Sequence, residues 1–292
     1  MYSWTILLLL SLIWGSSFIL MKRGLEVYSS EQVACLRIGL AAVLFFPIFL
    51  RYLNKIKRSQ VKYILLVALT GSGLPAFLFA FAQTEISSSL AGILNSLTPL
   101  FTFILGLLFF GQSFLWRSLV GVILGLSGAV LLVIMSGQSS LEGNLFYTLL
   151  AVIAAISYAV SGNTVHRYLR SMTAFGLNAT TFSLLGPFVI IYLLQTDFVN
   201  TLQTAEGAWE ALGYIAILSW VGTFAATVLF FQLVQWNDAV FGSSVAYLIP
   251  IVALMWGFWD GEVLAWYHLT GLALIISGVY AIRQGKSTPS EN

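Results

Sequence analysis

Arg37 is the one ionisable side chain that the sequence places well inside a long apolar segment, about two helical turns from the nearer end. A charged group at that depth is costly in hydrocarbon, so it faces protein or water and is a candidate functional residue. A guanidinium could bind a substrate carboxylate through two parallel hydrogen bonds. It could equally act as a structural or gating charge that pairs with Glu31 or Glu85. The sequence leaves both interpretations open, and we favour the structural or gating role.

Pro99 and Pro250 each fall near the middle of an apolar segment. A proline inside a helix removes one backbone N–H and crowds the carbonyl four residues earlier. Pro99 should therefore free the carbonyl of Asn95, and Pro250 that of Ala246. A freed carbonyl in a membrane needs a partner in the protein or a watery cavity. We predict that both prolines kink their helices, open a cavity and act as hinges, the alternative being a kink that serves packing only.

Polar and aromatic residues near these prolines are the candidates for substrate binding. An amide, phenols, hydroxyls and rings around an apolar cavity would hold a small amphipathic organic molecule, and they do not suit a bare metal ion. For each aromatic residue, simple packing is the competing interpretation. The predicted substrate-binding residues are Trp14, Ser17, Phe77, Phe81, Asn95, Tyr158, Asn163, Phe224 and Tyr247. We expect no catalytic residue, no cofactor and no metal.

The composition shows what kind of element must position these residues. Of the 292 residues, 59% are hydrophobic and only 8% are charged, whereas soluble domains carry about 25% charged residues. Apolar runs long enough to cross a bilayer as helices follow one another along nearly the whole chain. The sequence therefore predicts an all-α integral membrane protein with ten transmembrane helices, near residues 3–21, 31–50, 61–82, 89–110, 117–136, 143–165, 173–194, 210–234, 239–259 and 266–283.

The basic residues predict how these helices are oriented. With the N-terminus in the cytoplasm, ten lysines and arginines fall on the inner side and two, Lys22 and Arg23, on the outer side. An excess of Lys and Arg marks the cytoplasmic face. We therefore expect both termini in the cytoplasm of a protein of the cell (inner) membrane. The inner basic residues are Arg51, Lys55, Lys57, Arg58, Lys62, Arg117, Arg167, Arg170, Arg283 and Lys286.

The two halves of the chain repeat each other. The pattern G-x4-W-x2-L-x-G-x2-L-x2-S-G begins at Gly111 and again at Gly261, and Pro99 aligns with Pro250. Residues 1–137 would form one five-helix repeat, residues 138–284 a second, and residues 285–292 a cytoplasmic tail. Because five is odd, the second repeat must be inverted relative to the first. Inverted repeats around a central cavity are a recurrent design of secondary transporters.

The paired repeats, the segment Trp14-Gly15-Ser16-Ser17-Phe18, Arg37 and the late-helix prolines together resemble the drug/metabolite transporter superfamily, specifically its ten-helix EamA-type exporters. The resemblance covers almost the whole chain. It implies a central cavity between the halves and cargoes such as amino acids, their derivatives, nucleotide precursors or drugs. One departure is Gln112, since the equivalent residue of the second half is the acid Glu262.

The predicted function is secondary transport of a small amphipathic metabolite by alternating access, with export as the family expectation. A lipid-headgroup flippase or a channel-like permease of the same architecture remains the alternative. No enzyme motif is present, and no carboxylate lies near the midplane, so we predict facilitated diffusion or exchange with proton coupling as the rival. The expected partners are the bilayer and the small-molecule substrate but no nucleic acid, and one chain suffices although an oligomer is possible.

Overall fold

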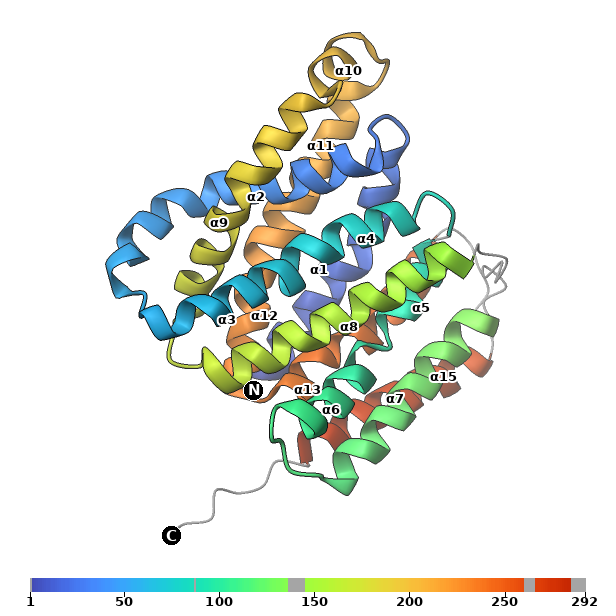
Figure 1. The fold of residues 1–292 in the computed structure, drawn as a ribbon. Helices are drawn as coiled ribbons and strands as arrows, with labels where there is room; N and C mark the ends of the chain where they lie inside the picture. Colours follow the sequence, from blue (N-terminus) through green and yellow to red (C-terminus); the bar gives the residue numbers. More distant parts are fainter. Residues whose placement is uncertain (1, 87, 136–144, 260–265, 285–292) are drawn as a thin grey trace.

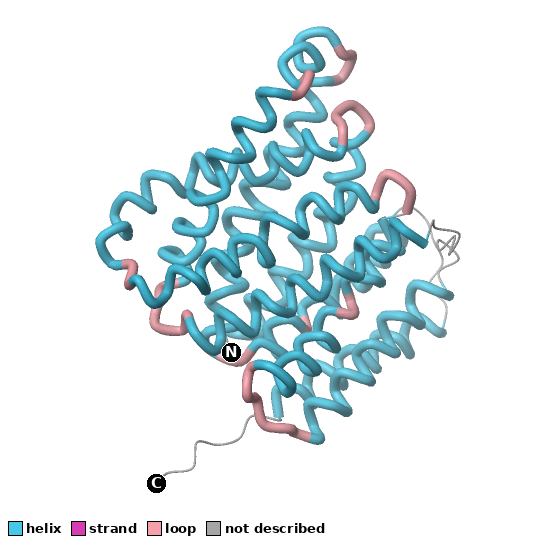
Figure 2. The backbone as a smooth tube through the Cα atoms, in the orientation of Figure 1, coloured by secondary structure: helices cyan, strands magenta, loops and turns pink. Residues whose placement is uncertain are grey.

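The structure is a computed structural model that describes residues 2–86, 88–135, 145–259 and 266–284. Every regular element in these residues is a helix, and the connections are short (Figure 2). Six helical segments are long and apolar enough to cross a membrane, and four shorter apolar helices accompany them. This confirms an all-helical, multi-pass membrane protein.

The elements of the first half, in chain order, are α1 (Tyr2–Leu25), α2 (Ser30–Tyr52), η1 (Leu53–Lys55), α3 (Arg58–Ala68), η2 (Leu69–Gly73), α4 (Leu74–Ala82), α5 (Ser88–Asn95), α6 (Thr98–Phe109) and α7 (Trp116–Met135). Those of the second half are α8 (Leu145–Tyr168), α9 (Ala174–Gln195), α10 (Phe198–Thr204), α11 (Ala208–Ser219), η3 (Trp220–Ala225), α12 (Ala226–Trp236), α13 (Ala239–Ser243), α14 (Val245–Trp259) and α15 (Trp266–Gln284). Every range predicted to be helical contains helix. The segment between the ranges 173–194 and 210–234, expected to be a plain loop, also contains the short helix α10.

Two long predicted helices are interrupted by π-helical segments. The range 61–82 contains η2 and the range 210–234 contains η3, and both are π-helices. The start of η2 at Leu69 and the start of η3 at Trp220 are 151 residues apart (69 + 151 = 220). A π segment inserts one residue into the α-helical ladder and is typical of functional sites.

The helices that contain Pro99 and Pro250 differ from the prediction of two continuous helices. The range 89–110 is two helices, because α5 ends at Asn95 and Pro99 lies in the first turn of α6. A proline there costs no hydrogen bond, since the first N–H groups of a helix have no intrahelical partner. The range 239–259 also divides, at Ser244, whereas Pro250 lies inside α14.

Small residues set the closest helix contacts. Helices α7 and α15 lie side by side (Figure 1), and a methyl group added at Gly278 would stand 2.5 Å from the backbone nitrogen of Gly125. Glycines at such contacts let two helix backbones approach each other in lipid. The same side-by-side packing joins α2 to α9.

The connections gather at two opposite edges of the bundle. In Figure 1, the N-terminal end of α1 and the α6–α7 and α8–α9 connections lie along the lower left edge. Helix α10 and the α1–α2 and α4–α5 connections lie along the upper right edge. The helices therefore run back and forth between two edges.

Candidate substrate-binding cavity

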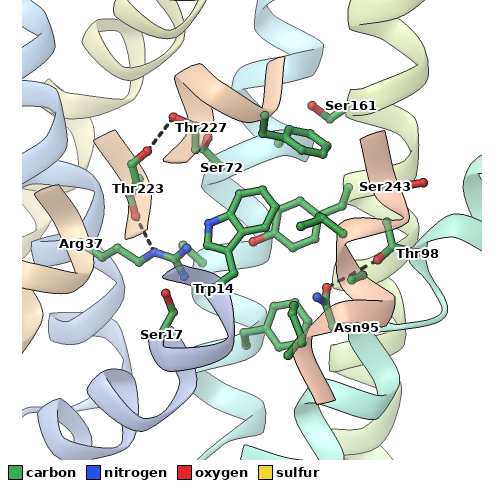
Figure 3. Close-up of a pocket in the computed structure, with 18 of the residues that line it drawn as sticks. Trp14, Ser17, Arg37, Ser72, Asn95, Thr98, Ser161, Thr223, Thr227 and Ser243 are labelled. Carbon is green, nitrogen blue, oxygen red and sulfur yellow. Dashed lines mark hydrogen bonds between the residues drawn. The ribbon is translucent and has the colours of Figure 1, made fainter. Parts of the chain in front are cut away.

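A cavity lies between segments of both halves of the chain. Its walls come from α1, α2, η2, α4, α5, α6, α8, α9, η3, α12, α13 and α14, and it measures about 990 Å³ when the part open to solvent is included. The walls combine rings with hydroxyl and amide groups (Figure 3). The hydroxyl and amide residues in the lining are Ser17, Ser72, Asn95, Thr98, Ser161, Thr223, Thr227 and Ser243.

Arg37 reaches into this cavity from α2. Its Nε donates a hydrogen bond of 2.9 Å to Thr223 Oγ1 of η3, and the guanidinium points towards Trp14 (Figure 3). It also interacts with the hydroxyl of Tyr158 on α8. Its side chain therefore contacts two elements of the second half.

Arg37 forms no ion pair with Glu31 or Glu85, the two partners that the sequence suggested. Within the described residues, the one ion pair joins Arg23 to Glu26, with Nη1 and Oε1 2.9 Å apart. The lining residues that the structure describes include no acidic side chain. The guanidinium in the cavity is held by neutral hydroxyls.

Trp14 and Tyr158 present aromatic rings to the cavity from α1 and α8. The Trp14 ring lies 5.2 Å from the Phe230 ring, and the Tyr158 ring lies 6.1 Å from the Phe79 ring, between centroids. The indole N–H of Trp14 donates a hydrogen bond of 2.8 Å to the carbonyl of Gly222. Because Gly222 lies in a π segment, this bond uses a carbonyl where the regular α ladder is interrupted.

Four predicted substrate-binding residues, Trp14, Ser17, Asn95 and Tyr158, belong to the cavity lining, and so does Arg37, which the sequence suggested as a structural or gating charge. These residues come from four different elements, α1, α2, α5 and α8.

Four other predicted substrate-binding residues lie outside the lining. Asn163 is fully buried, donates to the Thr102 carbonyl at 3.0 Å and accepts from Gln112 at 2.8 Å. It thus links α8 to α6 and to the segment that follows α6. Phe77 and Phe81 line a separate, shallow surface hollow beside Glu31. The Phe224 ring packs on Phe45 with centroids 4.3 Å apart.

Tyr247, the fifth such residue, is completely buried away from the cavity. Its hydroxyl donates a hydrogen bond of 3.0 Å to the carbonyl of Val122 on α7. Its ring leaves no room for a methyl group at Gly125, which would approach ring carbon Cδ2 to 2.6 Å. The surroundings of Tyr247 are those of a packing residue between α14 and α7.

The carbonyl freed by Pro250 has a protein partner. The hydroxyl of Ser96, buried in the break between α5 and α6, lies 3.0 Å from the carbonyls of both Ala246 and Gly92, which share its single O–H as donor. The break in the first half thus supplies the donor that the proline in the second half requires. Neither Pro99 nor Pro250 is in the cavity lining.

Sequence reasoning missed several lining residues of the second half. Thr223 lies 151 residues after Ser72 (72 + 151), and Phe230 lies 151 residues after Phe79 (79 + 151), and all four line the cavity. The repeat itself was therefore the signal that could have found Thr223 and Phe230.

The fold and the cavity define the class of the protein. A multi-pass helical membrane protein with a polar and aromatic cavity between its helices has the arrangement of a solute transporter. The sequence model of the EamA-like transporter family matches residues 2–134 and 145–284, and the chain belongs to this family. The protein is a transporter and not an enzyme, as the sequence predicted.

Relatives of this chain span nearly its whole length. A probable terminal-alkyne amino-acid exporter of Streptantibioticus cattleyicolor is 26% identical and covers 93% of this chain and 90% of its own. An uncharacterized inner membrane transporter of Escherichia coli K12, YedA, is 25% identical, with 95% and 89% covered. A solved crystal structure matches with a TM-score of 0.71 and 14% identity over 96% of each chain, a likeness of fold.

Proposed function

We propose that the protein is a secondary transporter of the cell membrane that moves a small amphipathic organic metabolite, of the amino-acid type, by alternating access. The observation that carries this proposal is the cavity itself. Rings of Trp14 and Tyr158 flank a guanidinium and several hydroxyls within one space. Such a lining suits a molecule with an apolar body and one or a few polar groups.

Two matching contacts, one from the first half to the second and one from the second half to the first, support the inverted arrangement of two five-helix repeats. Trp14 and Tyr158 are 144 residues apart (14 + 144). Trp14 packs on Phe230, and Tyr158 packs on Phe79. Helix α1 contacts the second half through Phe230, and α8 contacts the first half through Phe79. Helices α1 and α8 therefore exchange places when the halves are exchanged, as a two-fold axis in the membrane plane requires.

A serine packs against each π segment, and these two contacts are related between the halves in the same way as the ring contacts. Ser17 and Ser161 are also 144 residues apart (17 + 144), and Gly71 and Gly222 are 151 apart (71 + 151). A methyl group at Gly222 would stand 2.8 Å from Ser17 Oγ, and one at Gly71 would overlap Ser161 Oγ. The family model also matches each half of the chain. These pairs support two halves that swap shapes during transport.

The edges of the bundle support cytoplasmic termini. Arg58 begins α3 and Arg170 lies between α8 and α9, at the lower left edge where the chain begins in Figure 1. Basic residues on that side agree with the positive-inside rule. Export as the direction rests on the name of the relative from Streptantibioticus cattleyicolor.

Transport by the purified protein in liposomes tests this function. We expect saturable uptake of amino acids or related compounds, faster when the liposomes are preloaded with the same compound, because counter-transport marks a carrier. Flux without saturation would indicate a channel, and movement of labelled lipid without solute flux would indicate a flippase. Since no acid is among the described lining residues, we expect an imposed pH gradient to leave uptake unchanged. Strict dependence on the gradient would instead establish proton coupling.

A further inference from the structure

We infer that the cargo carries a carboxylate, and that Arg37 is the residue that binds it. The inference rests on the proposed transport function and specifies the charge of its substrate. A neutral molecule or an organic cation of the same shape would then be a poor cargo.

The first argument is the charge of the cavity. Among the described residues of the lining, Arg37 is the only Lys, Arg, Asp or Glu side chain. A guanidinium stays protonated in any protein environment. A positive charge away from bulk water is stabilised by an opposite charge, and breaking or lacking that pair is costly. Within the described part of the chain this cation has no anionic partner, and an anionic cargo would neutralise it.

The second argument is the geometry of the guanidinium. Thr223 occupies Nε at 2.9 Å and the Tyr158 hydroxyl supplies a further neutral contact. The bond to Thr223 leaves the Nη groups at the end of the side chain directed into the cavity (Figure 3). A carboxylate binds such an edge through two parallel hydrogen bonds, which a point charge like Lys cannot reproduce.

The third argument is that Arg37 does not recur. Helices α2 and α9 begin after the N-caps Ser29 and Thr173, which are 144 residues apart (29 + 144), the same offset as that between Trp14 and Tyr158. At that offset Arg37 corresponds to Thr181, which is 1% exposed and uncharged. The contacts of Trp14 and Ser17 recur in the second half, whereas the charge is confined to one half. A charge needed only for packing of the repeat would have a counterpart, so its single occurrence favours a role with the cargo.

The remaining polar groups of the lining suit the rest of such a molecule. Ser161 is 1% exposed and its Oγ has no hydrogen-bond partner among the described residues. Asn95 adds an amide and Trp14 a ring. A carboxylate on Arg37 with an apolar body against Trp14 would use these groups without requiring an acidic residue.

The test compares acids with their neutral and cationic counterparts. Binding of 3-phenylpropionate, indole-3-propionate and 4-methylpentanoate to the purified full chain is measured by calorimetry, alongside the carboxamide and the primary amine of each carbon skeleton. We expect at least one acid to bind about tenfold more tightly than its carboxamide, because a charge-assisted pair is about twice as strong as a neutral one. The matching amine should not bind measurably.

Variants of Arg37 separate substrate binding from a structural role. In Arg37→Gln we expect the acid and the carboxamide to bind within about twofold of each other, with the carboxamide unchanged from wild type. Arg37→Lys keeps the charge without the fork and should give an intermediate ratio. Arg23→Gln, at an exposed arginine outside the cavity, is the matched control and should retain the wild-type ratio. A structural arginine would instead lower the affinity for acid and carboxamide equally.

Two outcomes are decisive and distinguishable. If carboxamides or amines bind as tightly as the acids, the inference is overturned while the proposed transport function stands. If no compound of any charge binds or is transported, the proposed function fails first and the inference with it. Should Arg37→Gln not fold, the wild-type series still decides, and Thr223→Val, which frees Nε, should lower acid affinity alone.

Discussion

Asn95 and Tyr247 carry the same kind of sequence signal, a polar side chain about one turn before a proline. The structure gives them different surroundings. Asn95 lines the cavity, with its Oδ1 3.5 Å from Thr98 Oγ1, whereas Tyr247 is buried against α7. Because a helix places successive side chains at about 100° intervals, proximity to a proline in sequence does not determine which side chain faces the cavity.

This difference predicts opposite effects of two conservative changes. Asn95→Ala should slow transport severalfold and leave the thermal unfolding temperature nearly unchanged, because a cavity amide is lost and no packing is disturbed. Tyr247→Phe should leave transport near wild type and reduce stability by about 1 kcal/mol, the usual net value of one hydrogen bond. Liposome uptake and unfolding monitored by fluorescence give the two readouts. A Tyr247→Phe protein that is stable but inactive would place this phenol in the transport pathway.

The buried amide pair at the end of α6 supports a further prediction. Gln112 and Asn163 bind each other at 2.8 Å, and Asn163 also binds the Thr102 carbonyl. Asn163→Ala should cost about 1–3 kcal/mol, because the Gln112 amide and the Thr102 carbonyl lose their partner in a buried site. Gln112→Ala removes the Gln112 amide itself, leaves the bond between Asn163 and Thr102 in place and should cost less. Equal costs for the two variants, measured by denaturation in detergent, would contradict this account.

At the scale of elements, the π segment η3 packs closely against the cavity-lining helix α1. The carbonyl of Gly222 in η3 accepts a hydrogen bond from Trp14 of α1. The same glycine packs against Ser17 of α1. Helix α1 is therefore held against η3 by one hydrogen bond and by close packing. A contact with little bulk can slide more readily than one with interdigitated side chains, which suits a moving interface.

Gly222→Ala tests this contact. The added methyl group would stand 2.8 Å from Ser17 Oγ, but 3.9 Å from Ser17 Cβ. We expect Gly222→Ala alone to lower the unfolding temperature and the transport rate, and Ser17→Ala in addition to restore most of the stability. The expected coupling between the two changes is about 1 kcal/mol, within the range for residues in contact. Strictly additive effects would show that Ser17 and Gly222 do not touch.

Gly278 in α15 is the matched control for that rescue. A methyl group there would meet the backbone of Gly121 and Gly125 at 2.5–2.9 Å, not the end of a side chain. Gly278→Ala should therefore destabilise the protein, and no single side-chain truncation on α7 should relieve it. Recovery of Gly278→Ala by such a truncation would show that the two backbones have room to separate.

Features of the fold that depend on local sequence properties could be predicted from the sequence, whereas features that depend on contacts across the bundle could not. Long apolar runs fixed the positions of helices, and the repeat related Pro99 to Pro250, because hydrophobicity and glycine spacing are local properties. The division at Ser96 and the π segments were missed, since they depend on contacts across the bundle, such as the bond from Ser96 to Ala246. Of the predicted substrate-binding residues, those on α1, α5 and α8 include cavity-lining side chains, whereas Phe77, Phe81 and Phe224 lie outside the lining, because periodicity alone does not give the rotation of a helix.

At the scale of the whole molecule, the proposed exchange of the two halves concerns contacts that recur in both halves and a charge, Arg37, that does not. The rings, the serines and the π segments recur in both halves. Arg37 does not recur. An alternating transporter of this design needs similar energies for its two open forms, which repeated contacts provide. A single charge at the centre can serve either form, because the cavity remains at the same depth while the halves exchange shapes.

The proposed inverted arrangement predicts that corresponding loops react with reagents from opposite faces of the membrane. The chain has one cysteine, Cys35, which is buried. In a Cys35→Ala background, single cysteines at Asn54 and Ser171 should react with a membrane-impermeant maleimide only from the cytoplasmic side. Cysteines at Thr84 and Asn200 should react only from the outside. All four positions are exposed, so reactivity reports sidedness and not burial.

Asn54 and Asn200 form the informative pair, because each follows the second long helix of its own half, α2 and α9 respectively. In a parallel duplication these two positions would share a face, and in an inverted one they must lie on opposite faces. Labelling in intact cells and in inside-out vesicles distinguishes the two cases without a known substrate. Reaction of both cysteines from one face would leave the halves unable to exchange shapes about an axis in the membrane plane, and alternating access by that exchange would have to be abandoned.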